Sequence, residues 1–163
     1  MFYVSPMLAL AAMTSFAAAA VTQFCRYPDG FAIQNFTTFT PKGENEPTNI
    51  KFHYIDEITH LDVDCVYNGT QPNINADGEL PRYLCDFKYV HFTCYAQKGN
   101  LTVFERLCYL EDQEEMHYDA IGWVKPKLDC CKSTNPEGVH CVANPDVVGA
   151  FFTGKAESPK VDE

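Results

Sequence analysis

The chain has 163 residues and a formal net charge of −10 at pH 7, from 22 acidic and 12 basic side chains. A chain this acidic lacks the basic surface that nucleic-acid phosphates require, and anionic membrane surfaces are disfavoured for the same reason. We therefore predict no nucleic-acid partner and no membrane partner, and the length suits one domain with a single core.

An apolar N-terminal segment has the features of a secretion signal. Residues 1–20 carry no charged side chain and end in Ala18-Ala19-Ala20, which fits a small-residue cleavage site. The apolar run is too short and too rich in alanine for a transmembrane helix. We predict a signal peptide over 1–20, a single domain over 21–153, and a secreted, extracellular protein.

Eight cysteines in an exported chain indicate a disulfide framework. They are Cys25, Cys65, Cys85, Cys94, Cys108, Cys130, Cys131 and Cys141. An even set in an oxidising compartment argues for paired cysteines and against a catalytic thiol. Three N-x-[ST] sequons also predict exposed glycosylation positions, at Asn35, Asn68 and Asn100.

Short runs of alternating apolar and polar residues, separated by turn residues, predict strands along most of the chain. The predicted strands cover 31–39, 49–55, 61–67, 87–94, 101–110, 117–124 and 147–153. A cysteine-rich loop is expected after Pro126, and 154–163 is expected to be a flexible C-terminal tail because it has no apolar pattern. The fold class is therefore all-β: a single disulfide-stabilised antiparallel β-barrel or sandwich of about seven to nine short strands.

The sequence contains no recognisable catalytic motif: G-x-S-x-G, H-E-x-x-H and the P-loop are all absent. The densest ionisable cluster comprises His53, Asp56, Glu57, His60, Asp62 and Asp64. It is open to two functional interpretations, acid–base hydrolysis by His53 and Glu57 as in small secreted ribonucleases, or binding of a divalent metal. A charged turn between two strands with solvated polar faces is preferred, since no spacing matches a known ligand or nuclease pattern. We predict no catalytic residue, no metal and no cofactor.

Three other features have a structural and a functional interpretation. An acidic run is expected to be a solvated hairpin loop, with docking of a basic protein as the alternative; it comprises Glu111, Asp112, Glu114, Glu115 and Asp119. Trp123, the only tryptophan, is expected to pack in the core, and an exposed anchor for a partner is the alternative. His91 alternates with apolar neighbours, which predicts a residue on a strand face.

The order of several motifs carries a resemblance to a known family. These motifs are Phe31-x-Ile33-x-x-Phe36, Ile50-x-Phe52, Leu61-x-Val63-x-Cys65, Trp123-Val124 followed by Cys130-Cys131, and Val139-His140-Cys141. Together they cover roughly residues 24 to 153. In this arrangement the chain resembles the fungal secreted β-barrel proteins typified by the major Alternaria allergen, a family that includes secreted elicitors and effectors.

The resemblance implies two disulfides. By position, Cys65 matches the family's first half-cystine and Cys85 its partner. The same comparison implies that Cys141 pairs with Cys130 or with Cys131, and it leaves the choice between them open. Bridges of this kind contribute on the order of 2–4 kcal/mol each, chiefly by restricting the unfolded chain.

The other cysteines depart from the family pattern. In the typical allergen an N-terminal cysteine joins two subunits, and Cys25 sits where that residue would be. Cys94 and Cys108 lie on neighbouring predicted strands and are able to bridge each other. That pairing leaves Cys25 with the spare member of the Cys130-Cys131 pair and removes a covalent dimer. Monomer and homodimer both stay open.

The resemblance implies a non-enzymatic effector, elicitor or allergen that binds host extracellular proteins, among them defence proteins, or is recognised by the host. Two alternatives remain: a barrel that carries a small apolar ligand, and a small secreted hydrolase that uses His53 and Glu57. An apolar cavity open to solvent would favour the carrier, and a filled barrel would favour protein binding.

Overall fold

The computed structural model describes residues 27–76, 78, 80–95, 100–107, 118–134 and 136–159, and ten strands lie within these ranges. They are β1 (Gly30–Pro41), β2 (Asn49–Asp56), β3 (Leu61–Tyr67), β4 (Tyr83–Leu84), β5 (Val90–Tyr95), β6 (Asn100–Arg106), β7 (Tyr118–Val124), β8 (Leu128–Thr134), β9 (Glu137–Ala143) and β10 (Val147–Glu157). In this part of the chain, no helix is long and apolar enough to cross a membrane. The predicted signal peptide lies outside the described residues.

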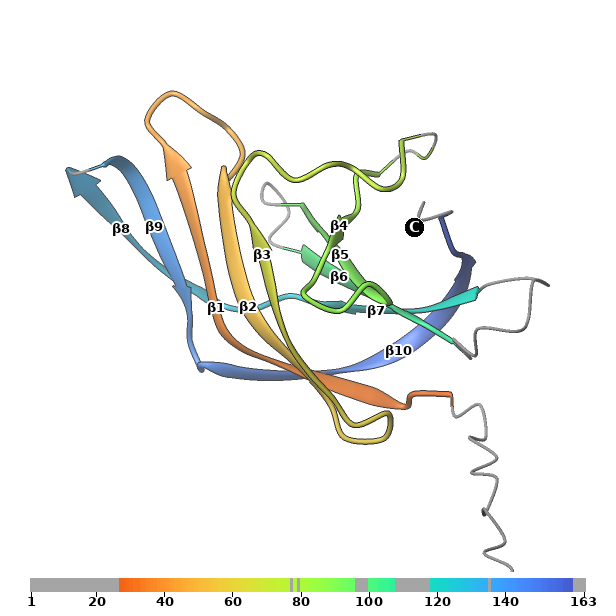
Figure 1. Cartoon of the computed structure of the whole chain (residues 1–163). Coiled ribbons are helices and arrows are strands. Elements are labelled where there is room, and N and C mark those ends of the chain that lie inside the picture. Colours follow the sequence, from red (N-terminus) through yellow and green to blue (C-terminus); the bar gives the residue numbers. More distant parts are fainter. Residues whose placement is uncertain are drawn as a thin grey trace, which may run out of the picture.

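The strands form an antiparallel sheet that curls into a nearly closed barrel (Figure 1). Neighbouring strands follow the order β3-β2-β1-β10-β7-β6-β5-β4. The two ends of this order meet at a seam, where the Asp86 N–H donates to the Asp64 carbonyl at 2.9 Å and a disulfide joins Cys65 to Cys85. The predicted all-β barrel is confirmed, with ten strands in the described residues rather than about seven to nine.

Two strands form a ribbon where the sequence predicted a cysteine-rich loop. β8 pairs with β9, and β9 pairs with the second half of β1 from Thr37–Val142 to Pro41–Gly138. Most side chains of β8 are exposed, so the strand lacks the apolar alternation by which a half-buried strand is identified. Figure 1 shows the ribbon extending away from the barrel. The loop prediction is therefore wrong.

A bulge in β1 allows this strand to pair with β10 in the barrel and with β9 in the ribbon. The register with β2 shifts between Gln34 and Thr37, and Asn35 at the bulge has a φ of 53°. Asparagine adopts this left-handed conformation more readily than most residues. Before the bulge β1 pairs with β10, and after it β1 pairs with β9. The Asn35 N–H donates to the Asp146 carbonyl at 3.2 Å, at the point where β9 gives way to β10.

The last strand extends into the segment that was predicted to be a flexible tail. β10 pairs with β7 from Phe152 to Glu157. Lys155 and Glu157 are exposed, so backbone hydrogen bonds rather than apolar side chains hold this end of the strand. The tail prediction is wrong for 154–157, and residues 160–163 lie outside the described ranges.

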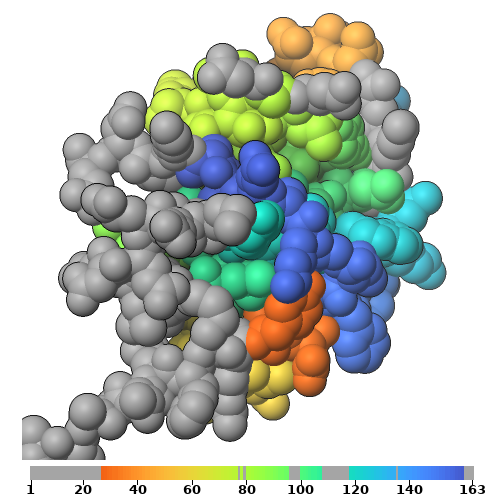
Figure 2. Space-filling view, turned by 90° about the vertical axis from the view of Figure 1, so that its right-hand side faces the viewer, coloured from red at the N-terminus to blue at the C-terminus, as the bar shows by residue number. Residues whose placement is uncertain are grey.

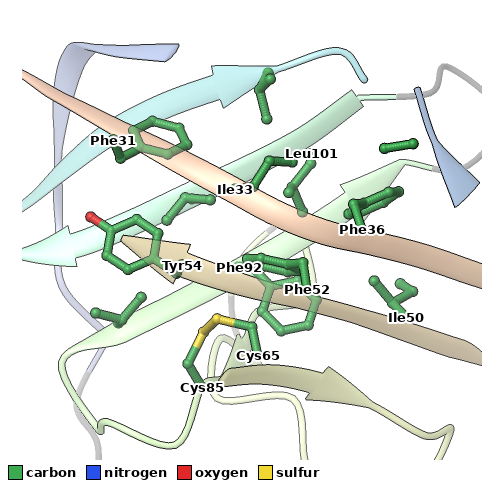
Figure 3. Packing of buried hydrophobic residues seen from close by; sticks show 14 of the residues in the cluster. Phe31, Ile33, Phe36, Ile50, Phe52, Tyr54, Cys65, Cys85, Phe92 and Leu101 are labelled. Carbon is green, nitrogen blue, oxygen red and sulfur yellow. A yellow bond between two sulfur atoms is a disulfide. The ribbon is translucent and has the colours of Figure 1, made fainter. Parts of the chain in front are cut away.

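Inward-facing aromatic side chains fill the barrel (Figure 3). The rings of Phe52 on β2 and Phe92 on β5 are fully buried and meet edge-on, with centroids 5.0 Å apart. The ring of Phe31 lies 5.7 Å from that of Tyr54. Because β2 and β5 are not neighbours in the sheet, the contact between Phe52 and Phe92 crosses the interior. The inner face of the barrel is thus a packed core.

Candidate functional site

The structure separates the six residues of the predicted ionisable cluster. His53, Asp62 and Asp64 meet on the outer face of β2 and β3, because antiparallel pairing sets His53 opposite Asp64. Asp56 is only 1% exposed and belongs to the barrel interior. The two others are exposed in the turn between the strands, at Glu57 and His60. The arrangement joins His53 to aspartates, and it does not support a catalytic pair of His53 and Glu57.

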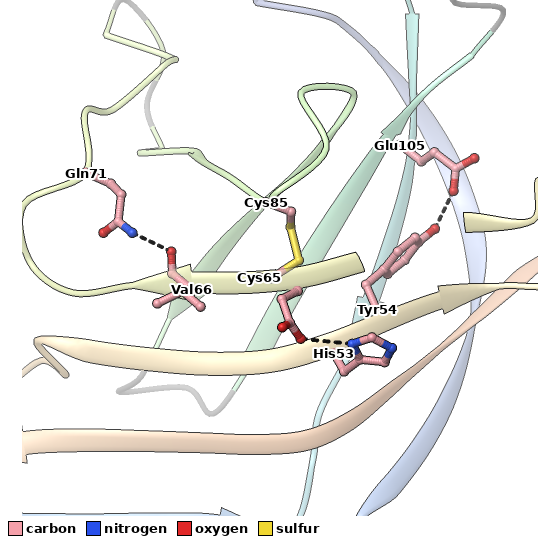
Figure 4. The surroundings of a disulfide bond; sticks show 8 residues. His53, Tyr54, Cys65, Val66, Gln71, Cys85 and Glu105 are labelled. Carbon is pink, nitrogen blue, oxygen red and sulfur yellow. Dashed lines mark hydrogen bonds and ion pairs between the residues drawn. A yellow bond between two sulfur atoms is a disulfide. The ribbon is translucent and has the colours of Figure 1, made fainter. Parts of the chain in front are cut away.

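His53 is held between two carboxylates. Its Nδ1 lies 2.9 Å from Asp64 Oδ1, the contact drawn at His53 in Figure 4, and its Nε2 lies 2.6 Å from Asp62 Oδ1. The hydrogen bond to Asp64 is the main cause that raises the pKa of His53; Asp62 acts in the same direction and partial burial opposes it. In the protonated form that this shift favours, both ring nitrogens donate, and the imidazolium has no free lone pair with which to act as a general base.

Replacement of His53 by glutamine is expected to have a small effect that depends on pH. The raised pKa lies above the unfolded-state value of about 6.5, so the ionic contribution is fully present below that value and is lost as the pH rises through the folded-state pKa. His53→Gln should lower the free energy of unfolding by less than about 1 kcal/mol in mild acid, and by less again in mild base. Urea unfolding at both pH values measures the difference, and a larger loss in base would contradict the assignment.

A second group of ionisable side chains is buried between β5, β6 and β7. Asp119 is fully buried, although the sequence placed it in an exposed acidic run. Its Oδ2 lies 3.2 Å from Arg82 Nη1 and 2.9 Å from His91 Nε2, and its Oδ1 lies 3.7 Å from Arg106 Nε. Ser158, just after β10, donates from Oγ to Asp119 Oδ1. We call these five residues the Asp119 cluster. The rest of the acidic run, 111–115, lies outside the described residues.

The Asp119 cluster contains serine, histidine and aspartate without the order of a catalytic triad. Ser158 donates to Asp119 rather than to His91, so the hydroxyl group lacks the histidine contact that a triad requires. Burial, followed by the charges of Arg82 and Arg106, lowers the pKa of His91 to about 3, and the ring stays neutral near neutral pH. His91 is a buried residue of β5, as a strand-face position predicts. The cluster is an ion-pair network that ties three strands to the end of β10.

The predicted ionisable cluster around His53 does not form a metal site in the described residues. Among the described residues, no three histidine, cysteine, aspartate or glutamate side chains form a group able to hold a metal ion. The carboxylates nearest to His53, those of Asp62 and Asp64, are both engaged by its ring nitrogens. The exposed polar face of β2 and β3 is therefore an ion-paired surface.

Among the described residues, two aromatic side chains are more than half exposed on the outside of the barrel. Phe151 is 74% exposed and Trp123 is 57% exposed, so the core prediction for the tryptophan is wrong. Phe152 of β10 pairs with Gly122 of β7, and Phe151 and Trp123 are the residues next to this pair on the two strands. Val147, which alternation places on the same face of β10, is 50% exposed. We call Trp123, Val147 and Phe151 the outer aromatic surface.

The strands that carry the outer aromatic surface are paired with their neighbours in the sheet: β10 pairs with β1 and with β7. Gly30 of β1 pairs with Phe151, and a Cβ atom at Gly30 would lie 3.3 Å from Cδ1 of that ring. Glycine at this position therefore leaves room for the aromatic side chain. Figure 2 shows the start of β1, in orange, beside β10, in blue, on this side of the molecule. Exposed aromatic groups on ordered strands are a typical signature of a protein contact site.

Four of the described cysteines form two disulfides. Cys65 is joined to Cys85, and Cys130 to Cys141. These are pairings that the resemblance implies. Cys65 is fully buried and Cys85 nearly so, and their bond ties the seam of the barrel (Figure 4). Cys130 and Cys141 are directly opposite in the β8–β9 pairing, so this bond holds the ribbon.

Two further cysteines are free thiols, in contrast to the prediction that all eight are paired. The β5–β6 register pairs Cys94 with Leu101, and the predicted bridge from Cys94 to Cys108 is not formed. Burial raises the pKa of the Cys94 thiol to about 12, which makes it unreactive. Cys131 is exposed on β8. Because Cys130 is bonded to Cys141 and Cys131 is free, the predicted bridge from Cys25 to the spare member of that pair is not formed either. Cys25 and Cys108 themselves lie outside the described residues.

The three sequons differ in accessibility. Asn35 is exposed at the bulge of β1. Asn68 is exposed after β3, and its Oδ1 accepts hydrogen bonds from the backbone N–H and the hydroxyl group of Thr70, at 3.1 and 2.6 Å. Asn100 is only partly exposed at the start of β6. Glycosylation at the three positions stays a prediction, and Asn100 is the least accessible of them.

The outer aromatic surface was not predicted from the sequence beyond the alternative of an exposed Trp123, although one signal pointed to it. Phe151 and Phe152 are adjacent on a strand, and adjacent strand residues face opposite sides of the sheet. One of the two rings must therefore leave the core. Trp123 offered no such signal, because its flanking residues, Gly122 and Val124, fit either face.

Comparisons with known proteins identify the fold. No family model matches the sequence, and no curated protein matches it. A crystal structure of the Alternaria alternata allergen Alt a 1 superimposes with a TM-score of 0.56 and 15% identity, over 90% of this chain and 100% of that chain. A second crystal structure of Alt a 1 gives a TM-score of 0.55 and 14% identity, over 83% and 99% of the two chains. The chain has an Alt a 1-like β-barrel fold.

Proposed function

We propose that this chain is a secreted, non-enzymatic fungal protein that acts outside the cell by binding a host extracellular protein through the outer aromatic surface. The observation that carries the proposal is the exposure of Trp123 and Phe151 on neighbouring strands of a disulfide-closed barrel. Aromatic side chains dominate the binding energy of many protein interfaces, because they bury a large area at little cost in side-chain entropy.

The extracellular location is supported by two features of the chain. Residues 1–20 have the pattern of a cleaved signal peptide, and two disulfides form within the described residues. The resemblance in motifs and the Alt a 1-like fold favour a fungal source and a role as effector, elicitor or allergen. The net charge of −10 favours a basic partner, because opposite charge speeds association.

The two alternatives receive less support from the geometry. A carrier needs an interior cavity, whereas the inner-face rings of this barrel meet across the interior. A hydrolase needs a base with a free lone pair beside a nucleophile or a water. His53 is engaged by two carboxylates, and His91 is buried, neutral and bonded to Asp119. Binding through the outside of the barrel is the function that the geometry favours.

The test removes the two rings and asks whether binding is lost. Trp123→Ser combined with Phe151→Ser should reduce capture of the partner from plant extracellular fluid on the order of tenfold or more, as expected for two hot-spot residues. The purified wild type and the variant are immobilised at equal density, and captured proteins are quantified by mass spectrometry. Circular dichroism checks that the variant keeps its fold.

The matched control removes exposed apolar side chains elsewhere. Val139 and Val142 on β9 are each 38% exposed, and neither belongs to the outer aromatic surface. Val139→Ser with Val142→Ser should leave capture at the wild-type level. Equal capture by all three proteins would overturn the proposal, as would a loss confined to the β9 variant.

A further inference from the structure

A pair of buried carboxyl groups lies inside the barrel, away from the Asp119 cluster. Asp56 is the last residue of β2 and Glu105 is near the end of β6, and each is only 1% exposed. β2 and β6 are not neighbours in the sheet, so contacts between them cross the interior. The Tyr54 hydroxyl group donates to Glu105 Oε2, as Figure 4 shows.

The pair is incompletely satisfied by its surroundings. Asp56 Oδ1 accepts from the Ile58 N–H at 2.7 Å and the Thr59 N–H at 3.1 Å, which holds the turn after β2. The other carboxyl oxygens, Asp56 Oδ2 and Glu105 Oε1, are buried without a hydrogen-bond partner, and so is Thr59 Oγ1. A buried oxygen that loses water and gains no partner costs about 1–3 kcal/mol, and more when it is charged.

No positive charge in the described residues compensates the pair. The groups that act on Glu105 are Tyr54 and Asp56 of β2 and Thr59 of the turn. Its partners on the two neighbouring strands are uncharged, Val90 on β5 and Ala120 on β7. Two carboxylates without a cation cannot both stay ionised in a buried site, and a single proton between them supplies the missing hydrogen bond.

We propose that Asp56 and Glu105 share one proton, which latches β2 to β6 across the barrel, and that release of this proton to solvent loosens the turn between β2 and β3. The second carboxylate charge repels Asp56, whose Oδ1 holds the two amides of the turn. The chain thus contains a pH-sensitive element that is closed in acid and loosened in base.

The surroundings of Glu105 place the release of the proton near neutral pH. Burial is the main cause that raises the pKa of Glu105 to about 7, and the charge of Asp56 acts in the same direction. The hydrogen bond from Tyr54 acts in the opposite direction. The folded-state pKa lies above the unfolded value of 4.5, so the protonated latch stabilises fully below about pH 4.5, and its contribution is lost as the pH rises through about 7.

Hydrogen exchange of the turn amides tests the latch in the whole protein. Protection of the Ile58 and Thr59 amides, corrected for the intrinsic rate, should fall at least about tenfold between about pH 5 and about pH 8.5 in the wild type, since one pKa unit corresponds to tenfold. Glu105→Gln cannot ionise and should show less than about twofold change. Glu57→Gln, in the same turn but exposed, should keep the wild-type dependence.

A second variant keeps the test decisive if Glu105→Gln does not fold. Tyr54→Phe removes a donor that favours the ionised form of Glu105, so the fall in protection should move to higher pH. Constant protection in the wild type, a full pH dependence in Glu105→Gln, or a move to lower pH in Tyr54→Phe would each overturn the proposal. Recovery of protection at high pH on addition of calcium ions would also overturn it, because the pair would then bind a cation.

Discussion

Replacement of Asp119 by asparagine is expected to lower the free energy of unfolding by about 3–5 kcal/mol, as the loss of one partner from a buried ion pair does. The carboxylate is fully buried and is the shared counter-ion of Arg82 and Arg106, whose side chains are each 11% exposed. An amide keeps the shape but leaves two guanidinium groups with a neutral neighbour. Urea unfolding at neutral pH measures the loss.

Two further variants show whether unpaired charge causes that loss. Asp86→Asn changes an exposed aspartate on the segment after β4 and should alter stability by less than about 0.5 kcal/mol. Arg82→Met in the Asp119→Asn background removes one of the stranded charges and should recover part of the stability. A loss below about 1 kcal/mol in Asp119→Asn, or no recovery in the double variant, would show that the cluster is not an energetic unit.

Removal of the seam disulfide is expected to cost about 3 kcal/mol, the chain-entropy value for a loop of this size. Cys65 and Cys85 are 20 residues apart in sequence, and their bond closes the barrel where β3 and β4 meet. The paired variant Cys65→Ala with Cys85→Ala avoids a stranded thiol. Urea unfolding without reductant measures the change against the wild type.

The ribbon disulfide supplies the matched comparison. Cys130 and Cys141 are 11 residues apart and join β8, which is largely exposed, to β9 in the ribbon. Cys130→Ala with Cys141→Ala should loosen the ribbon locally and change global unfolding less than the seam variant does, because local opening does not require the barrel to unfold. The reverse order of the two losses would contradict the assignment of the seam to the stability of the barrel.

The alternation of side chains was enough to predict the strands that form the core. Ile50, Phe52 and Tyr54 face inward on β2 as their spacing predicts. The same rule failed for β8, which is exposed on both faces, and for the end of β10, which backbone pairing to β7 holds in place. Both failures occur where stability comes from hydrogen bonds that leave no trace in side-chain composition.

The candidate site was harder to predict because it depends on contacts distant in sequence. Asp119 was assigned to an exposed acidic run, but Arg82, from the segment before β4, and Arg106 of β6 pair with it. Trp123 was assigned to the core by hydrophobicity, whereas the sheet turns its face outward. Cys94 was assigned to a hairpin bridge, but the register sets Leu101 opposite. Strand register and barrel closure depend on contacts between residues distant in sequence, and these contacts cannot be predicted from a single sequence.

If the outer aromatic surface binds a protein, the fluorine signal of a labelled Trp123 reports on that contact alone, because Trp123 is the only tryptophan of the chain. The protein is labelled with 5-fluorotryptophan, and its single fluorine resonance is recorded before and after addition of plant extracellular fluid. Binding at the surface predicts that this resonance shifts or broadens, and that Phe151→Ser greatly reduces the change. A resonance that stays unchanged while the protein demonstrably captures a partner would place the contact elsewhere and contradict the account.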